Sequence, residues 1–270
     1  MLPIAQFESQ LRSEGAAKKT IQFYVTPVRK FSEHCRKPLD QVTTEDVYSF
    51  RDSVTSSDYA KHNAIRAVKF FLKRNGIKLE IKLPSFVPPA PDEYQPHQLK
   101  QLFAAADEKE HRLFMFFLCT GCREGEVQHA MWENLTQDSY TVRSVEGWRP
   151  KKNKTRTIPI PDSLSSLLEP VRGSGLIFPN IHSRPDGHFL KKLCHLAKRS
   201  GQCPEDFQLQ KFRRTFATTH LRNGATIHEL MGWMGWSDMN VAMRYLALAN
   251  TKSERVRSLA NSAFATMGGV

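Results

Sequence analysis

Apolar residues recur at three- and four-residue intervals through most of the first third of the chain, which is the spacing of one face of a helix. One such run begins at Ile21 and ends at Phe31. The sequence TTED at residues 43–46 is typical of a helix N-cap followed by an acidic first turn. Asn75-Gly76 is a natural stop for a later helix. We therefore predict four short helices within residues 4–79.

This helical pattern stops at a proline-rich stretch. Four prolines fall between Pro84 and Pro91. A run of this kind favours extended backbone and cannot continue a helix. We therefore predict a helical domain over residues 1–82, a linker over residues 83–94 and a second domain over residues 95–270.

The second domain combines helical patterns with one pair of alternating segments. Residues 140–145 and 156–160 alternate as the two strands of an antiparallel hairpin do, and a lysine-rich tip joins them. Helices are predicted from Gln95, across 113–118, across 163–200 with a loop at 178–180, as two or three short helices within 210–245, and across 252–264. The predicted fold class is therefore mainly α with a small β-hairpin.

The charge of the chain indicates its kind of partner. The 270 residues carry a formal net charge of +12, and the pI is about 9.6. Residues 1–90 contain 15 Lys and Arg against 9 Asp and Glu, and the rest of the chain holds the other half of the excess. A basic balance in both domains favours a polyanion such as duplex DNA, held between the domains as in a clamp.

Other features exclude several classes of protein. The N-terminus lacks the basic start and apolar run of a signal peptide, and no stretch approaches the roughly 18 apolar residues of a membrane span. An odd number of cysteines, five, argues against a secreted disulfide framework. Cys119 and Cys122 have the spacing of a zinc-ligand pair, but no second pair accompanies them, so no metal is expected. We expect a cytoplasmic, nucleoid-associated protein with no membrane partner.

The segment from Gln210 to Tyr245 carries the most specific signal. It reads Gln-x-x-Arg, then Thr-Phe-Ala, then Met-Gly-Trp, and Tyr245 follows Trp236 by nine residues. This spacing resembles the C-terminal signature of the tyrosine recombinases, the phage integrase family. The resemblance implies that Arg213 and Trp236 contact the scissile phosphate and that Tyr245 is the nucleophile.

Two further motifs resemble parts of the same family. Thr-Gly-x-Arg-x-x-Glu at residues 120–126 resembles the first arginine box, which makes Arg123 a phosphate ligand and Glu126 its orienting carboxylate. An arginine suits this role because its planar, permanently charged fork can bond two phosphate oxygens at once. Lys151 stands eight residues before Pro159, where the catalytic lysine of the family would be. Lys152 and Lys154 are rivals for that role, and the turn could also be an ordinary solvated basic turn.

What the family does defines the expected activity. The tyrosine attacks a DNA phosphate and forms a 3′-phosphotyrosyl bond, which stores the energy of the broken ester, so no cofactor is expected. Four protomers join two duplexes through a Holliday junction and pass a C-terminal segment between neighbours. Residues 246–270 are long enough for that exchange. Accessory DNA-bending proteins are possible partners.

Gln210 departs from the family pattern, because it occupies the position of a histidine. A glutamine amide can donate a hydrogen bond to a phosphate oxygen but cannot take up a proton. A non-catalytic DNA-binding protein on the same scaffold is therefore one alternative, with Gln210 as a first sign of decay. A type IB topoisomerase-like enzyme, which uses the same chemistry as a single protein, is another.

For the first domain the resemblance extends only to the architecture, since the family also has a small helical DNA-binding domain there. The basic side chains of this domain are candidates for contacts with DNA phosphates, against the plainer alternative that each is a solvated surface charge. They are Lys18, Lys19, Arg29, Lys30, Lys61, Arg66 and Lys69. We add Lys152 and Lys154 of the second domain.

Overall fold

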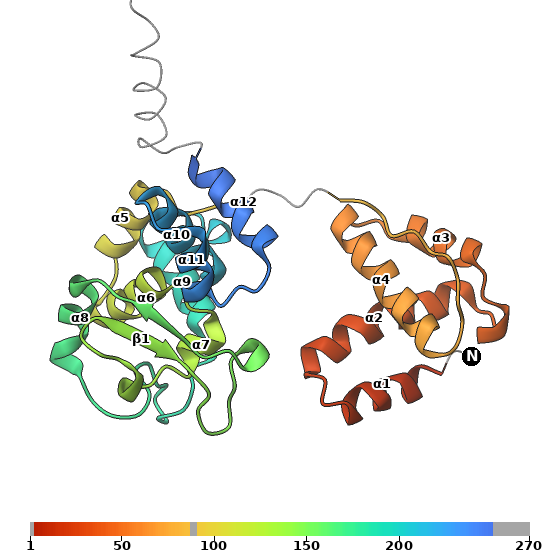
Figure 1. Ribbon diagram of the computed structural model, residues 1–270, viewed down its shortest axis with the longest axis horizontal. Coiled ribbons are helices and arrows are strands. Elements are labelled where there is room, and N and C mark those ends of the chain that lie inside the picture. The colour runs from red at the N-terminus through yellow and green to blue at the C-terminus, as the bar shows by residue number, and fades with distance from the viewer. Residues whose placement is uncertain (1–2, 87–90, 251–270) are drawn as a thin grey trace, which may run out of the picture. The chain divides into compact units, whose positions relative to one another are not determined.

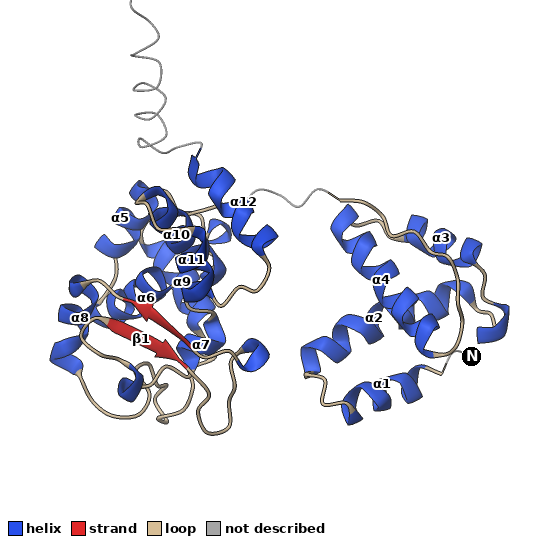
Figure 2. Ribbon diagram, in the orientation of Figure 1, coloured by secondary structure: helices blue, strands red, loops and turns tan. Residues whose placement is uncertain are grey.

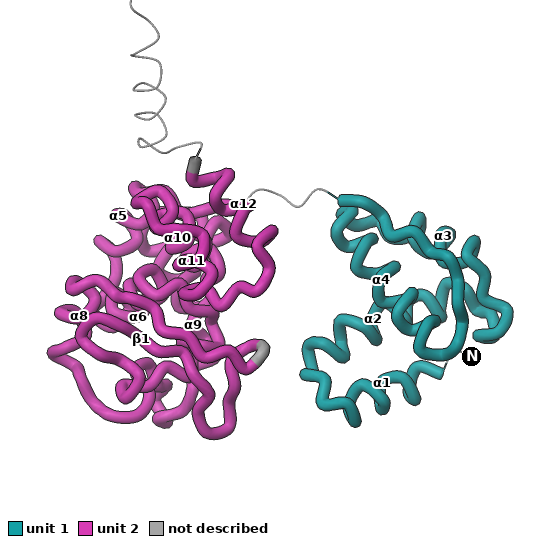
Figure 3. Tube along the Cα trace, viewed as in Figure 1, with its two compact units in different colours: residues 1–89 teal, residues 90–270 magenta. Residues whose placement is uncertain are grey.

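The computed structural model describes residues 3–86 and 91–250 and divides the chain into two compact units (Figure 1, Figure 3). Unit 1 spans Met1–Pro89 and unit 2 spans Ala90–Val270. The helix predicted across residues 252–264 lies outside the described residues. None of the helices within the described ranges is both long enough and apolar enough to cross a membrane.

Unit 1 contains the four helices predicted from the sequence. They are α1 (Ile4–Ser13), α2 (Lys18–Cys35), α3 (Thr44–Ser53) and α4 (Asp58–Arg74), with a short 3-10 turn at Leu39–Gln41. The cap predicted before α3 is confirmed. The Thr43 hydroxyl accepts a hydrogen bond from the Asp46 backbone N–H at 3.4 Å, and the Asp46 carboxylate accepts one from the Thr43 N–H at 2.9 Å. Both ends of this box satisfy N–H groups that the helix itself leaves unpaired.

Phenylalanine rings form much of the core of unit 1. Phe7 and Phe71 meet edge to face, with ring centroids 5.1 Å apart. Phe31 and Phe50 meet in the same way at 5.4 Å. The four rings come from α1, α4, α2 and α3 in turn, so the helical spacing of apolar residues places one large side chain from each helix in the core.

Unit 2 is also mainly helical (Figure 2). Its helices are α5 (Pro96–Ala104), α6 (Glu108–Thr120), α7 (Glu124–Gln128), α8 (Asp162–Leu168), α9 (Phe189–Arg199), α10 (Leu209–Arg222), α11 (Ile227–Met234) and α12 (Met239–Asn250). Short 3-10 turns lie at Trp132–Asn134, Lys151–Asn153, Glu169–Val171 and Pro204–Asp206. Strands β1 (Ser139–Val142) and β2 (Arg156–Pro159) form the single sheet found among the described residues.

The two strands pair antiparallel, as predicted, but β1 is shorter than expected. In the observed register Tyr140 faces Ile158 and Val142 faces Arg156. The predicted strand continued to residue 145, whereas the chain turns there and Val145 forms an isolated bridge with Trp148. Gly147, with φ of 73°, provides the left-handed residue that this turn needs.

The predicted helix across residues 163–200 is wrong in its middle part. α8 ends at Leu168 and α9 begins only at Phe189. The intervening chain contains glycines at 173, 175 and 187 and prolines at 179 and 185. These residues disfavour a helix by their backbone freedom or by lacking an N–H, and together they outweigh the apolar spacing on which the prediction depended.

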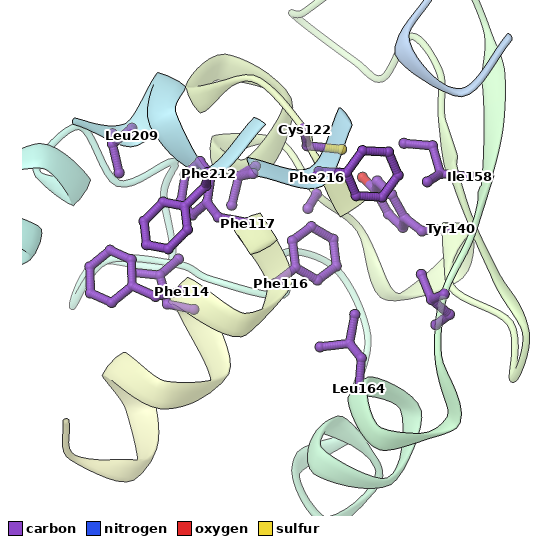
Figure 4. Packing of buried hydrophobic residues seen from close by; sticks show 14 of the residues in the cluster. Phe114, Phe116, Phe117, Cys122, Tyr140, Ile158, Leu164, Leu209, Phe212 and Phe216 are labelled. Atoms are coloured by element: carbon purple, nitrogen blue, oxygen red, sulfur yellow. The ribbon is translucent and has the colours of Figure 1, made fainter. Parts of the chain in front are cut away.

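The core of unit 2 is built around α6 and α10 (Figure 4). The Phe212 ring of α10 stacks on Phe114 at 5.8 Å and on Phe117 at 6.0 Å, both from α6. On the other side of α6, Phe116 meets Tyr140 of β1 edge to face at 5.0 Å. α6 therefore joins the hairpin to α10, the helix that carries Gln210 and Arg213.

Candidate active site

Arg213 lies on α10 and is buried, with an exposed fraction of 2%. Its guanidinium donates to the Gly121 carbonyl oxygen at 2.7 Å and to the Met234 carbonyl oxygen at 2.5 Å. Gly121 caps the C-terminus of α6, and Met234 is the last residue of α11. Carbonyls at such ends have no partner within their own helix. Arg213 therefore satisfies both and ties the ends of α6 and α11 to α10.

Only glycine fits at position 121. Its φ of 58° lies in the left-handed region, and a Cβ atom there would lie 2.8 Å from the Phe216 ring. The absence of a side chain thus lets α6 end in a left-handed cap while α10 packs directly against that cap. The carbonyl that receives Arg213 is held in place by this close packing.

The buried guanidinium of Arg213 remains charged. Burial, and secondly the nearby charge of Arg123, lower the pKa of Arg213 to about 9. This value is still above neutral pH, so the side chain is positive under ordinary conditions. A charge in a dry site acts more strongly on a bound anion than the same charge in water.

Arg123 and Glu126 form a pair at the start of α7. The Glu126 carboxylate accepts hydrogen bonds from the Arg123 backbone N–H at 2.8 Å and from Arg123 Nη1 at 2.9 Å. The Glu126 side chain is 2% exposed, whereas that of Arg123 is 30% exposed. A buried carboxylate therefore caps the helix and holds a guanidinium that reaches the surface, which is the geometry that an orienting carboxylate requires.

Trp236 lies between Arg213 and Tyr245. The rings of Trp236 and Tyr245 stack with centroids 4.8 Å apart and planes inclined by 26°. The Arg213 guanidinium carbon lies 5.9 Å from the Trp236 ring centroid, within the range of a cation–π contact. Tyr245 is carried by α12, which packs against α10 and α11. The aromatic pair therefore connects α12 to the buried arginine.

The electrostatic surroundings of Tyr245 are strongly positive. Burial raises the pKa of its phenol, and the charges of Arg214, Arg213, Arg244 and Arg123 oppose that rise. Tyr245 thus lies within electrostatic reach of both Arg123 and Arg213. Because the net shift is upward, the phenol is neutral at physiological pH.

The lysine turn is separate from this cluster. Asn153, with φ of 51°, closes the turn, and its N–H donates to the Pro150 carbonyl at 2.8 Å. The Ser144 hydroxyl donates to the Asn153 side-chain oxygen at 2.8 Å, which links the turn to the segment that follows β1. Lys151 is exposed, and among the side chains that the structure describes none bonds to it. The structure therefore does not bring Lys151 into contact with the two arginines.

The sequence model of the phage integrase family matches residues 93–252, and that of the N-terminal SAM-like domain of phage integrases matches residues 4–76. The chain belongs to the phage integrase family. Members of this family are site-specific recombinases, so the predicted class, a tyrosine recombinase, and the predicted mainly helical fold are confirmed.

Individual relatives agree with this assignment. The chain is 24% identical to the tyrosine recombinase XerA of Pyrococcus horikoshii over 258 residues, which cover 90% of this chain and 87% of that protein. It is 24% identical to the integrase of Salmonella phage P22 over 188 residues, which cover 64% of this chain and 48% of that protein. The fold resembles that of the Tn1549 transposon integrase in complex with transposon right end DNA, with a TM-score of 0.74, 16% identity and coverage of 97% of this chain and 100% of that one.

In this member of the family, Gln210 lies on the exposed side of α10, near its N-terminus. It lies one turn before Arg213, in the first turn of the helix. Its side chain is exposed, and no hydrogen bond joins it to another residue in the described part of the chain. The amide is therefore free to contact a ligand, but it can neither accept nor release a proton as a histidine would.

Arg156 is the residue of this region that the sequence prediction missed. It begins β2, and its guanidinium donates to Glu126 at 3.0 Å and 2.5 Å, opposite Arg123. The signal was present in the alternation of β2. Arg156 is in phase with the inward-facing Ile158, and an arginine at an inward position of a strand requires a buried counter-charge.

The basic residues predicted to bind DNA in unit 1 all lie on α2 or α4. Lys18, Lys19, Arg29, Lys30, Arg66 and Lys69 are exposed, and Lys61 is half-buried. Two of them are partly engaged within unit 1: Lys69 donates to the Ile81 carbonyl at 2.7 Å, and the Arg66 guanidinium lies 5.3 Å from the Phe23 ring centroid. The pairs at 18–19 and 29–30 are separated by three helical turns, so they lie on the same side of α2.

Cys119 and Cys122 do not gather further ligands. Within the described ranges, no group of three or more His, Cys, Asp or Glu side chains is arranged to hold a metal ion. Burial raises the pKa of Cys122 to about 12, so this thiol is protonated, and it packs in the core beside α10 (Figure 4).

Proposed function

We propose that this chain cuts and rejoins DNA strands through a covalent bond between Tyr245 and a backbone phosphate. The observation that carries the proposal is the stacking of Tyr245 on Trp236, whose ring also lies against the Arg213 guanidinium. The phenol is thereby within electrostatic reach of Arg123 and Arg213, whose planar forks suit phosphate oxygens.

The chemistry conserves the number of phosphate ester bonds. The Tyr245 phenol loses its proton to solvent as its oxygen forms a bond to phosphorus, and the bond from phosphorus to the 5′-oxygen breaks, leaving a 3′-phosphotyrosyl intermediate. Arg123 and Arg213 would neutralise charge developing on the non-bridging oxygens, and the Trp236 N–H would donate to one of them. Lys151 would protonate the departing 5′-oxygen. Attack by the 5′-hydroxyl of a second strand then releases the tyrosine and joins the strands.

Strand exchange of this kind needs several protomers. A relative, lambda integrase, is known as a tetramer bound to a Holliday junction. We extend this arrangement to the present chain, with duplex DNA contacted by α2, α4 and the lysine turn that includes Lys152 and Lys154. The C-terminal segment proposed to pass between protomers lies outside the described residues. DNA-bending accessory proteins would assist assembly in the same scheme.

The test begins by finding a DNA site. Duplexes bound by the full chain are selected from a randomised pool, and the selected site is then prepared with a nick at successive positions, so that the short strand released by cleavage diffuses away. Wild-type protein and Tyr245→Phe are incubated with each substrate and resolved on a denaturing gel. We expect a protein–DNA adduct with wild type on some of the substrates and none with Tyr245→Phe. An adduct of equal yield with Tyr245→Phe would overturn the assignment of the nucleophile.

A non-catalytic DNA-binding protein is the second candidate, and the exposed, unbonded Gln210 at the histidine position is the observation that favours it. This alternative predicts tight binding to the selected site with no adduct on any nicked substrate. A type IB topoisomerase-like activity predicts instead that a single protomer relaxes supercoiled plasmid without recombining two copies of the site. The same preparations of protein distinguish these outcomes.

A further inference from the structure

Arg156 occupies a buried position at the junction of three segments. Its side chain is 5% exposed. Nη1 and Nη2 donate to the two carboxylate oxygens of Glu126 at 3.0 Å and 2.5 Å, and Nε donates to the Trp233 carbonyl oxygen at 2.7 Å. The guanidinium therefore bonds a side chain at the start of α7 and the backbone near the end of α11.

The contact with α11 extends to the turn that carries Trp236. Gly235 follows α11 with φ of 61°, and a Cβ atom at that position would lie 3.2 Å from Arg156 Cδ. The aliphatic part of Arg156 thus packs directly on the backbone of Gly235, one residue before Trp236. Arg156 also begins the strand that follows the lysine turn.

Glu126 depends on Arg156 for its charge as well as its orientation. Burial favours the neutral acid, but the hydrogen bonds and charge of Arg156, together with the Arg123 backbone N–H and the charge of Arg213, outweigh that effect, and the pKa of Glu126 is lowered. The charged and titratable groups that face this carboxylate are Arg123, Arg156, Arg213, Cys122 and Tyr140. Cys122 and Tyr140 are neutral at ordinary pH, so the charge of Glu126 is balanced by arginines alone.

We propose that Arg156 is a positioning residue for strand cleavage, which holds Glu126 so that Arg123 meets the phosphate and holds the Gly235 turn so that Trp236 meets both the phosphate and Tyr245. This inference deepens the function proposed above and rests on it. It assigns Arg156 no contact with DNA. Its effect is to keep Arg123 and Trp236, two phosphate-binding groups from distant parts of the sequence, in fixed positions relative to each other.

The test measures the rate of adduct formation in a single turnover on the nicked duplex identified above. The variants are Arg156→Lys, which keeps the charge but loses the fork, and the double change Glu126→Gln with Arg156→Met, which removes the buried pair. Replacing both members of a buried ion pair with neutral groups is often tolerated in folding, so the double variant is expected to fold. Arg172→Met is the matched control, because it removes an exposed arginine that pairs with Glu169 at 3.2 Å in the same unit.

We expect both variants to form adduct about 10²-fold more slowly than wild type, the scale of loss when reacting groups are misplaced by about 1 Å. DNA affinity, and the far-UV circular dichroism spectrum as a measure of folding, should be unchanged, as should all properties of Arg172→Met. A folded double variant that reacts at the wild-type rate would overturn the proposal. Absence of adduct with the wild type itself would instead overturn the proposed function.

A second readout does not depend on cleavage. The carboxyl ¹³C signal of Glu126, assigned by its loss in Glu126→Gln, is followed against pH in wild type, in Arg156→Lys and in Arg156→Met. In wild type it should titrate below the usual value of about 4.3, and in Arg156→Met it should titrate at higher pH, because the hydrogen bonds and charge of Arg156 then no longer oppose the effect of burial. Titration at the same pH in all three proteins would contradict the claim that Arg156 holds Glu126.

Discussion

Replacing Gly121 with alanine tests how tightly α10 packs against the end of α6. A non-glycine residue in the left-handed region costs about 1–2 kcal/mol. The new Cβ would also lie 2.8 Å from two atoms of the Phe216 ring, and Phe216 is only 1% exposed, so it has little room to move. Overpacking of a core costs about 1–3 kcal/mol. We therefore expect Gly121→Ala to lower the free energy of unfolding of unit 2 by about 2–5 kcal/mol.

Gly201 provides a control that separates the two effects. Its φ is 75° and a Cβ atom there would meet nothing within 4 Å, so Gly201→Ala should cost only the backbone contribution of about 1–2 kcal/mol. Urea unfolding followed by tryptophan fluorescence measures both variants, since all four tryptophans belong to unit 2. Equal destabilisation by the two changes would refute the close packing of Gly121 on Phe216.

Three further outcomes are expected. Gln210→His should leave adduct formation intact or speed it by about 10- to 100-fold, because histidine restores acid–base capacity; abolition of the adduct would count against placing residue 210 at the histidine position of the family. Thr226→Ala should lower the free energy of unfolding of unit 2 by about 1 kcal/mol, because its hydroxyl accepts from the Glu229 N–H at 3.2 Å and caps α11; in the same urea assay Thr226→Ser should be nearly neutral, and a Ser variant as unstable as Ala would contradict the cap. Burial acts to raise the pKa of Glu126, but the bonds and charge of Arg156, with smaller contributions from Arg123 and Arg213, lower it overall. The ionised carboxylate therefore stabilises the fold above the unfolded-state pKa, and this contribution is lost as pH falls through the lower folded-state pKa. The stability difference between wild type and Glu126→Gln should therefore shrink below about pH 4, and a difference that stays constant down to acid unfolding would argue against the lowered pKa.

The sequence was sufficient to predict elements whose signals are local. The helices of unit 1 follow from apolar spacing and from the cap at Thr43, and the antiparallel pairing of β1 and β2 follows from alternation and from the lysine-rich turn between them. The region between α8 and α9 was mispredicted because apolar spacing persists there, while the glycines and prolines that prevent a helix act one residue at a time. Apolar periodicity is a property of a window of residues, whereas a single glycine or proline can end a helix.

The candidate site shows a different division between what is local and what is not. The spacing of Gln210, Arg213, Trp236 and Tyr245 is a sequence property because these residues lie on α10, in the turn after α11 and on α12, which follow one another along the chain. The hydrogen bonds that hold these residues in place cannot be read from the sequence, since Arg213 donates to carbonyls 92 and 21 residues away. Backbone acceptors leave no trace in residue identity. Arg156 is intermediate: its inward position in β2 demanded a counter-charge, but the sequence did not say which carboxylate would supply it.

The arginines that would bind the phosphate are held by hydrogen bonds within the protein, whereas no described side chain holds the lysine that would transfer a proton. Arg213 is fixed by two carbonyls, and Arg123 is fixed by a carboxylate that Arg156 holds in turn. Lys151 is exposed, and no described side chain bonds to it. If the proposed function holds, the site for the phosphate is therefore ready before DNA arrives, while the delivery of a proton to the 5′-oxygen and the removal of one from Tyr245 must be arranged afterwards. Because a proton donor acts only once it is positioned at the leaving oxygen, DNA that brings its 5′-oxygen to Lys151 would control whether the bound enzyme cleaves.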